Sequence, residues 1–309
     1  MKKILPFLIV FISGCSGDYY RHFHLPNKPF PTDKMPVPAG TVCIGKNLFI
    51  DEAEVSNFSY NEFVWWVKYT YGAESEEYKK VCPDQTVWAD LGRSYFSLTA
   101  YYLTHPAYRD YPAVGVSYDQ AKLFCKWRSD RVMEYILISE GVIDHRSSPT
   151  PDSCFTIERY FIGQYPLKKA RPHIIYYPEY TLPDSTVYMW SLNHLDSLNG
   201  KPPRRCYKKY RCRETLTLRC YDNIPFKNDT IPYGPDPTAA TICYGCPPYI
   251  THLQGNIREM TSQAGITFGG SFKDSCAVIK RQNFFNDTSI NCFTGFRCVC
   301  RYKTWPVLH

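Results

Sequence analysis

The chain has 309 residues and a formal net charge of +7, of which Lys2 and Lys3 supply two. This length suffices for one large domain or two small ones, and no apolar run beyond the first 14 residues is long enough for a membrane-spanning helix. Aromatic residues make up 16% of the chain, which also has 24 prolines and 17 glycines. This composition argues against a bundle of long helices and favours an irregular α+β fold with many turns.

The N-terminus has the organisation of a bacterial export signal. Two lysines precede an apolar stretch, residues 4–12, which is too short to cross a bilayer as a permanent helix. Ser13 and Gly14 stand directly before Cys15, and this order resembles the lipobox of bacterial lipoproteins. The resemblance implies that residues 1–14 are removed and that acylated Cys15 anchors the chain to a membrane. An ordinary cleavable signal beside a coincidental cysteine is the alternative.

The mature chain divides into a tether, a folded body and a short tail. Residues 15–38 hold five prolines among polar and aromatic residues, so we expect an extended tether. The body is predicted to span 39–303, and 304–309 form the tail. The chain has 14 cysteines, and Cys15 is the first of them, so an odd number remains for the body. In an exported protein this predicts several disulfides and at least one unpaired thiol.

Local patterns predict three elements in the first half of the body. Apolar residues recur often enough over 42–50 for a strand. Asn57 can cap a helix over 58–71, and Gly72 can end it. A second helix has clearer signals, which are a capping box of Ser117 with Gln120, a mostly apolar face as far as Leu137, and Gly141 after the last turn.

A basic insertion near 200–222 is the only strong charge block in the body. It contains cysteines and is either a solvated, disulfide-linked insertion or a site for an anionic partner, such as lipid headgroups or an acidic protein face. The chain has no phosphate loop and no nucleophile elbow, and nothing in it indicates a nucleic-acid partner. The basic residues of the candidate partner site are Arg204, Arg205, Lys208, Lys209, Arg211 and Arg213.

Five segments, in order along the chain, resemble the formylglycine-generating enzyme family, also called the sulfatase-modifying factor family. They correspond to the family's "IDxxEVTNxxYxxF", "PVVGVSWxxAxxYCxW", "GNVWEWT", "RGGSW" and "GFRCV" segments. The resemblance implies that family's irregular α+β fold, which is related to C-type lectins and has little regular secondary structure. The matching segments are 49–63, 111–127, 255–261, 268–272 and 295–299.

The resemblance does not include the residues for the family's oxidase chemistry. Oxygen-dependent members bind copper through two cysteines after the "GGS" segment, and here those positions are Asp274 and Ile279. Cys276 is two residues out of register, and one thiol cannot form the paired thiolate site that Cu(I) requires. We therefore predict a protein that is not an enzyme. An exported enzyme with altered chemistry, using Cys276 or a calcium-type site, and a glycan-binding lectin-like module are the alternatives.

The resemblance also implies a possible calcium site. Gly255, Ile257 and Glu259 match the family's ligands, which are two backbone carbonyls and a carboxylate. His252 stands where the family has an oxygen donor, although calcium prefers oxygen ligands. The alternative for Glu259 is that it is a buried acid paired with Arg297 or another core base.

A narrower resemblance concerns residues 105–112, 127–141 and 160–165. These segments resemble gliding-motility lipoproteins of Bacteroidota, of the GldJ type most and of the GldK/PorK type next. That resemblance implies a non-catalytic structural lipoprotein, anchored by lipid at the periplasmic face of the outer membrane, with the cell surface left open. Its partners would be envelope proteins of the type IX secretion and gliding apparatus.

Overall fold

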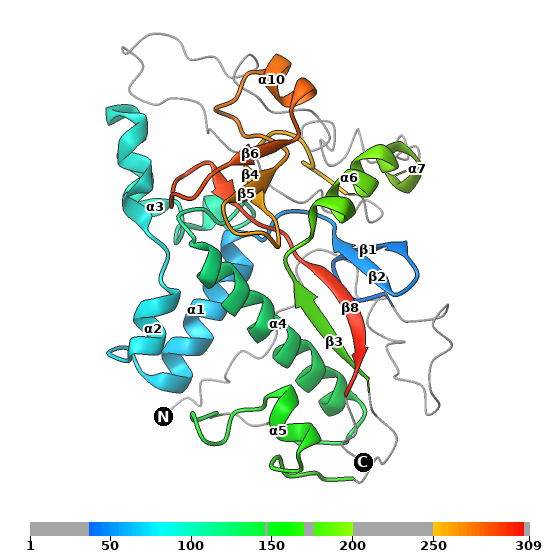
Figure 1. The fold of residues 1–309 in the computed structure, drawn as a ribbon. Coiled ribbons are helices and arrows are strands. Elements are labelled where there is room, and N and C mark those ends of the chain that lie inside the picture. The colour runs from blue at the N-terminus through cyan, green and yellow to red at the C-terminus, as the bar shows by residue number, and fades with distance from the viewer. Residues whose placement is uncertain (1–36, 146–147, 170–175, 200–249, 306–309) are drawn as a thin grey trace.

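A computed structural model of the chain describes residues 37–145, 148–169, 176–199 and 250–305 (Figure 1). Loops and three short 3₁₀ turns, Gln85–Leu91, Arg93–Tyr95 and Pro106–Tyr108, connect the elements, so the predicted irregular α+β fold is confirmed. The strands are β1 (Thr41–Gly45), β2 (Leu48–Asp51), β3 (Tyr176–Thr181), β4 (Arg258–Met260), β5 (Ile266–Phe268), β6 (Phe284–Asn286), β7 (Thr294–Gly295) and β8 (Val299–Thr304). The helices are α1 (Asn57–Tyr71), α2 (Glu76–Val81), α3 (Leu98–Tyr101), α4 (Tyr118–Ser139), α5 (Ile157–Phe161), α6 (Ser185–Asn193), α7 (Leu195–Asn199) and α10 (Cys276–Arg281).

Within the described residues, the strands form two four-stranded sheets. The first has the order β1-β2-β8-β3 and is antiparallel throughout, so the last strand of the chain lies between strands from its first two thirds. The second has the order β6-β5-β4-β7, in which only the pairing of β4 with β7 is parallel. Figure 1 shows the second sheet and α10 at one end of the molecule and α5 at the other.

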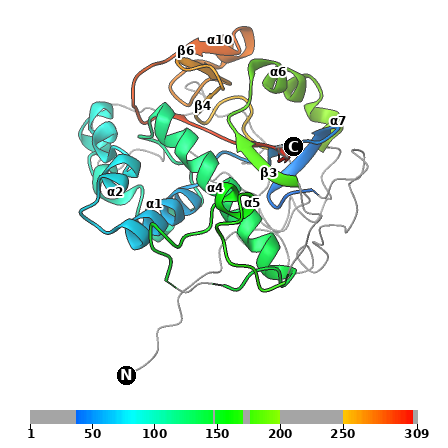
Figure 2. The ribbon, with the colours of Figure 1, turned by 60° about the horizontal axis from the view of Figure 1, so that its bottom comes forward.

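Helix α4 lies between the first sheet and the other long helix. It contacts β3 on one side and α1 and α2 on the other, and both views show this arrangement (Figures 1 and 2). The layer between these elements is aromatic. Phe124 of α4 stacks on Tyr60 of α1 with centroids 5.9 Å apart and meets Phe296 edge-on at 5.3 Å. Large side chains with little exposed surface thus hold the helices against the sheet.

The expectation of a single strand over 42–50 was wrong. The segment is a hairpin in which β1 and β2 pair, and the chain turns at Lys46 and Asn47. Asn47 has a φ of 52°, a conformation that asparagine tolerates better than most residues. Its side-chain amide accepts a hydrogen bond from the Tyr302 N–H at 2.9 Å and donates one to the Tyr302 carbonyl at 2.8 Å.

The predicted helices are present, with one change of cap. The Oγ of Ser56, not the side chain of Asn57, caps α1 by accepting the Ser59 N–H at 3.2 Å. Asn57 lies inside the first turn, where its buried amide donates to the carbonyls of Tyr102 and Tyr108. The capping box of Ser117 and Gln120 at the start of α4 is confirmed.

The first residues of the expected C-terminal tail have a defined structure. Strand β8 runs to Thr304, and the Trp305 ring stacks on Phe161 with centroids 4.9 Å apart, so these two residues of the expected tail pack on the body.

None of the helices in the described parts has the length and apolar character needed to cross a membrane.

Candidate functional site

The turn at the "GGS" segment is fixed by close packing. Gly269 and Gly270 both have positive φ, 89° and 72°. A Cβ on Gly269 would lie 2.5 Å from the carbonyl oxygen of Leu253, and a Cβ on Gly270 would lie 2.5 Å from Cγ1 of Ile279. Only glycine fits at either position. The turn therefore packs against Leu253, which precedes β4, on one side and against α10 on the other.

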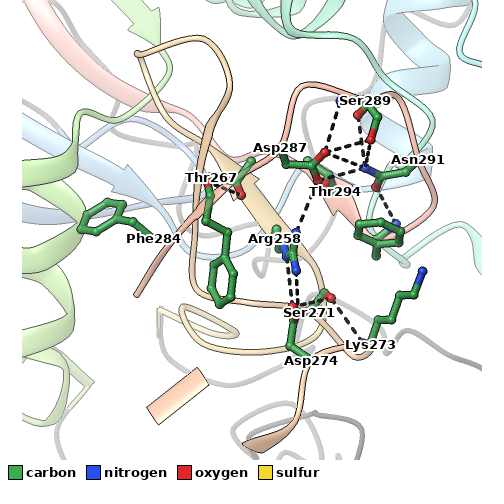
Figure 3. Close-up of polar contacts among 12 residues, drawn as sticks. Arg258, Thr267, Ser271, Lys273, Asp274, Phe284, Asp287, Ser289, Asn291 and Thr294 are labelled. Atoms are coloured by element: carbon green, nitrogen blue, oxygen red, sulfur yellow. Dashed lines mark hydrogen bonds and ion pairs between the residues drawn. The ribbon is translucent and has the colours of Figure 1, made fainter. Parts of the chain in front are cut away.

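Asp274, at the first oxidase-cysteine position, is held in a hydrogen-bonded ion pair (Figure 3). Arg258 of β4 donates to both of its carboxylate oxygens, from Nη2 at 2.6 Å and from Nε at 3.0 Å. Ser271 adds its N–H and its Oγ, each 2.8 Å from Oδ2. Burial alone would raise the pKa of Asp274, but these donors outweigh it and leave the pKa below its usual value.

The second oxidase-cysteine position is occupied by an apolar side chain, that of Ile279. Ile279 is fully buried on α10 beneath Gly270, so its side chain is part of the packing of the turn. Cys276 is disulfide-bonded, which contradicts the alternative that it serves as a free reactive thiol. Within the described ranges no three histidine, cysteine or acidic side chains are grouped so that they could hold a metal ion.

A second carboxylate, Asp287, completes the network in Figure 3. It accepts hydrogen bonds from the side chains of Ser289, Asn291 and Thr294, and Arg258 Nη1 lies 3.7 Å from Oδ2. The Arg258 guanidinium also lies 4.5 Å from the ring centroid of Phe285. Two acids and an aromatic face therefore neutralise and cover the arginine.

Most cysteines in the described region are free thiols, so the expectation of several disulfides is not met there. Seven are free, and Cys276 is the disulfide-bonded one. Burial raises the pKa of Cys292 to about 12, which keeps it protonated at neutral pH. The Sγ atoms of Cys125 and Cys298 lie 3.5 Å apart in the core. The free thiols are Cys43, Cys82, Cys125, Cys154, Cys292, Cys298 and Cys300.

The residues proposed for calcium lie together, but the carboxylate among them is paired. Gly255 and Ile257 precede β4, and Glu259 lies within it. Arg297 donates to both oxygens of Glu259, from Nη2 at 2.5 Å and from Nε at 2.6 Å, and both side chains are 0–1% exposed. The pairing of Glu259 with Arg297 is thus confirmed. Calcium stays a prediction, and the ion would have to compete with a buried guanidinium for Glu259.

A comparison with family models agrees with the first two of the five sequence motifs. A family model described as "Sulfatase-modifying factor enzyme 1-like domain" matches residues 15–186, more than half of the chain. The chain belongs to this family. Two solved structures are similar over 82% of the chain. Treponema denticola variable protein 1 has 13% identity, 84% of its own chain covered and a TM-score of 0.37, and CarF has 12%, 86% and 0.36. A search of curated proteins found no match.

The family model ends before the site, so its residues are compared with the family through the motifs alone. Arg258 stands where "GNVWEWT" has its first tryptophan and Asp274 where the family has a cysteine, and the structure pairs these two departures. Sequence reasoning missed this pair, although an unusual residue within one family motif and another just after the next motif were a usable signal. Cys15 and the six basic residues at 204–213 lie outside the described residues.

Proposed function

We propose that this chain is a non-catalytic structural lipoprotein of the cell envelope. It is anchored through Cys15 and acts by protein–protein binding in or beside the type IX secretion and gliding apparatus. Its body sits at the periplasmic face of the outer membrane. The observation that carries the proposal is the Arg258–Asp274 pair, which fills one oxidase position while buried Ile279 fills the other.

The chemistry of the two side chains supports this reading. A carboxylate with four hydrogen bonds at or below 3.0 Å is held in place and is no soft ligand for copper. An isoleucine that fills the space under a glycine turn can neither bind a metal nor exchange a disulfide. A fold that retains its packing without these groups is well suited to presenting surfaces to partners.

The cellular part is tested by deletion and by affinity purification. Deletion of the gene should abolish type IX secretion and gliding, and the tagged full chain from native membranes should co-purify envelope proteins. Cys15→Ser should release the chain from the membrane fraction. Intact secretion and gliding after deletion, together with an empty pull-down, would end the proposal.

The catalytic part needs a separate assay. The purified full chain should leave a cysteine-containing peptide unoxidised in the presence of oxygen and Cu(I), with an active oxidase of the family as positive control. The expected result is no conversion above the copper-only blank. Turnover that depends on the protein would favour an altered enzyme instead.

A further inference from the structure

A groove with a volume of about 510 Å³ runs beside α4, on its side toward β3 and α5. Four of its lining residues come from α4 at intervals of four, and they are Tyr118, Lys122, Lys126 and Asp130. Because an α-helix rises 1.5 Å per residue, this row is about 18 Å long. That length matches an extended peptide of about five residues.

One end of the groove is acidic and aromatic. Asp130 Oδ1 accepts the N–H of Ile157 at 2.9 Å, which places this end at the start of α5. Trp305 stacks on Phe161 of α5, and Tyr177 meets Trp305 edge-on with centroids 6.1 Å apart. Two further carboxylates, those of Glu158 and Glu179, also line the groove. Two aromatic rings and the carboxylates of Asp130 and Glu158 therefore mark this end, while Glu179 pairs with Lys303 at 3.5 Å.

The other end is basic. Tyr118 donates its hydroxyl to the carbonyl of Ser262 at 2.5 Å, and this contact closes the groove. The Lys122 ammonium lies 5.0 Å from the centroid of the Tyr118 ring, and Lys126 follows one helical turn later. Both lysine side chains are exposed, and Lys122 also forms an exposed ion pair with Asp119 at 3.0 Å, which a ligand carboxylate would have to compete with. The groove thus has opposite charge at its two ends.

A ligand in the groove cannot pair with the exposed edge of β3 as an additional strand. The Tyr180 N–H already donates to Ser129 Oγ at 2.8 Å. Pro178, two residues earlier on the same edge, has no N–H to offer. A ligand in the groove must therefore be recognised by side chains and not by backbone pairing with β3.

We propose that this groove binds an extended segment of a partner protein that carries an arginine or lysine and, three or four residues away, a carboxylate. The basic side chain lies at the Trp305 end, where aromatic rings and carboxylates attract a cation. The carboxylate lies at the Lys122 end. Lys122 and Asp130 are eight residues apart on α4, about 12 Å, which is the length of three to four extended residues. The proposal rests on the proposed function only in that the chain acts by binding.

Fluorescence anisotropy on the full chain in detergent tests this directly. The probes are a fluorescein-labelled Gly-Arg-Ala-Ala-Glu amide and the same peptide with citrulline, a neutral analogue of similar shape, in place of arginine. We expect the arginine peptide to bind at least fivefold tighter. Glu158→Gln should weaken its binding about two- to fivefold, the range of one exposed charge pair, and leave the citrulline peptide unaffected. Lys126→Gln should weaken both peptides.

The matched control is Glu77→Gln, an equally conservative change on α2 outside the groove, which should leave both affinities unchanged. Equal binding of the two peptides, no measurable binding of either, or displacement of the arginine peptide by chitotriose but not by unlabelled peptide would overturn the proposal. Peptide binding with an empty membrane pull-down would instead contradict the proposed function alone. A positive pull-down that Glu158→Gln leaves intact, without peptide binding, would contradict the groove alone.

Discussion

Two adjacent residues of β4 take part in two very different ion pairs. Glu259 faces the core and pairs with Arg297, and both side chains are 0–1% exposed. Arg258 points to the other face of the strand and pairs with Asp274, and these side chains are 16% and 13% exposed. Side chains of successive strand residues point to opposite faces, so one short strand separates the two environments.

The two pairs also differ in how their residues compare with the family's motifs. Glu259 and Arg297 come from the family's "GNVWE" and "GFRCV" segments, and their pairing connects the second sheet to the start of β8. Arg258 and Asp274 both depart from the family's pattern, at the positions where its chemistry would lie. The pair that matches the family's motifs thus lies on the buried face of β4, and the pair that departs from them lies on the other face.

The largest effect is expected from breaking the buried pair. Arg297→Met leaves the carboxyl group of Glu259 fully enclosed without its partner, so the free energy of unfolding should fall by about 3–5 kcal/mol in urea denaturation. The double variant with Glu259→Met as well should recover at least half of that loss, because the enclosed carboxylate is gone. A double variant as unstable as the single one would show that packing, not charge, dominates here.

The next largest effect concerns the two core thiols that lie beside this pair. Cys125 and Cys298 have Sγ atoms 3.5 Å apart, and a small rotation would allow a bond in an oxidising compartment. If the chain is exported as proposed, peptide mapping without reductant should find this disulfide in protein purified from its native source. Its reduction should cost about 2–4 kcal/mol of stability. Quantitative alkylation of both thiols after denaturation would contradict the prediction.

Sequence reasoning succeeded where the signal is local. The capping box of Ser117 and Gln120 and the stop at Gly72 depend on residues within one or two turns, and the structure contains both. It failed at 42–50, because the turn at Asn47 is stabilised by Tyr302, 255 residues away. Such a partner leaves no trace in the local pattern of apolar residues.

The candidate site shows the same division. The motifs located Asp274, Ile279 and Glu259, and the pairing of Glu259 with Arg297 was one of two stated alternatives. The bond from Arg258 to Asp274 was missed because it joins two segments through a tertiary contact. The groove was missed because one of its aromatic walls is Trp305, which the sequence places in a tail.

Breaking the partly exposed pair should have a smaller effect. Arg258→Met removes two hydrogen bonds from Asp274 but leaves those from Ser271, and the side chains retain some contact with water. We expect a loss of about 1–2 kcal/mol in the free energy of unfolding. A cost as large as that of Arg297→Met would show that the replaced site is as essential to the fold as the core.

The last effect is a pH dependence that comes from the buried face. Burial raises the pKa of Glu54 to about 8, although Arg297 opposes the shift, and the Asn256 amide donates to its Oε1 at 3.0 Å. Between its ordinary pKa of 4.5 and about 8 the folded state holds a proton that the unfolded state has released, so stability falls as pH rises through this window. One such proton corresponds to a slope of at most about 1.4 kcal/mol per pH unit.

Glu54→Gln should flatten the decline in unfolding free energy between pH 5.5 and 8, while Glu77→Gln should not. An unchanged slope in Glu54→Gln would assign the decline to other acids, such as Glu52, whose pKa burial raises to about 7.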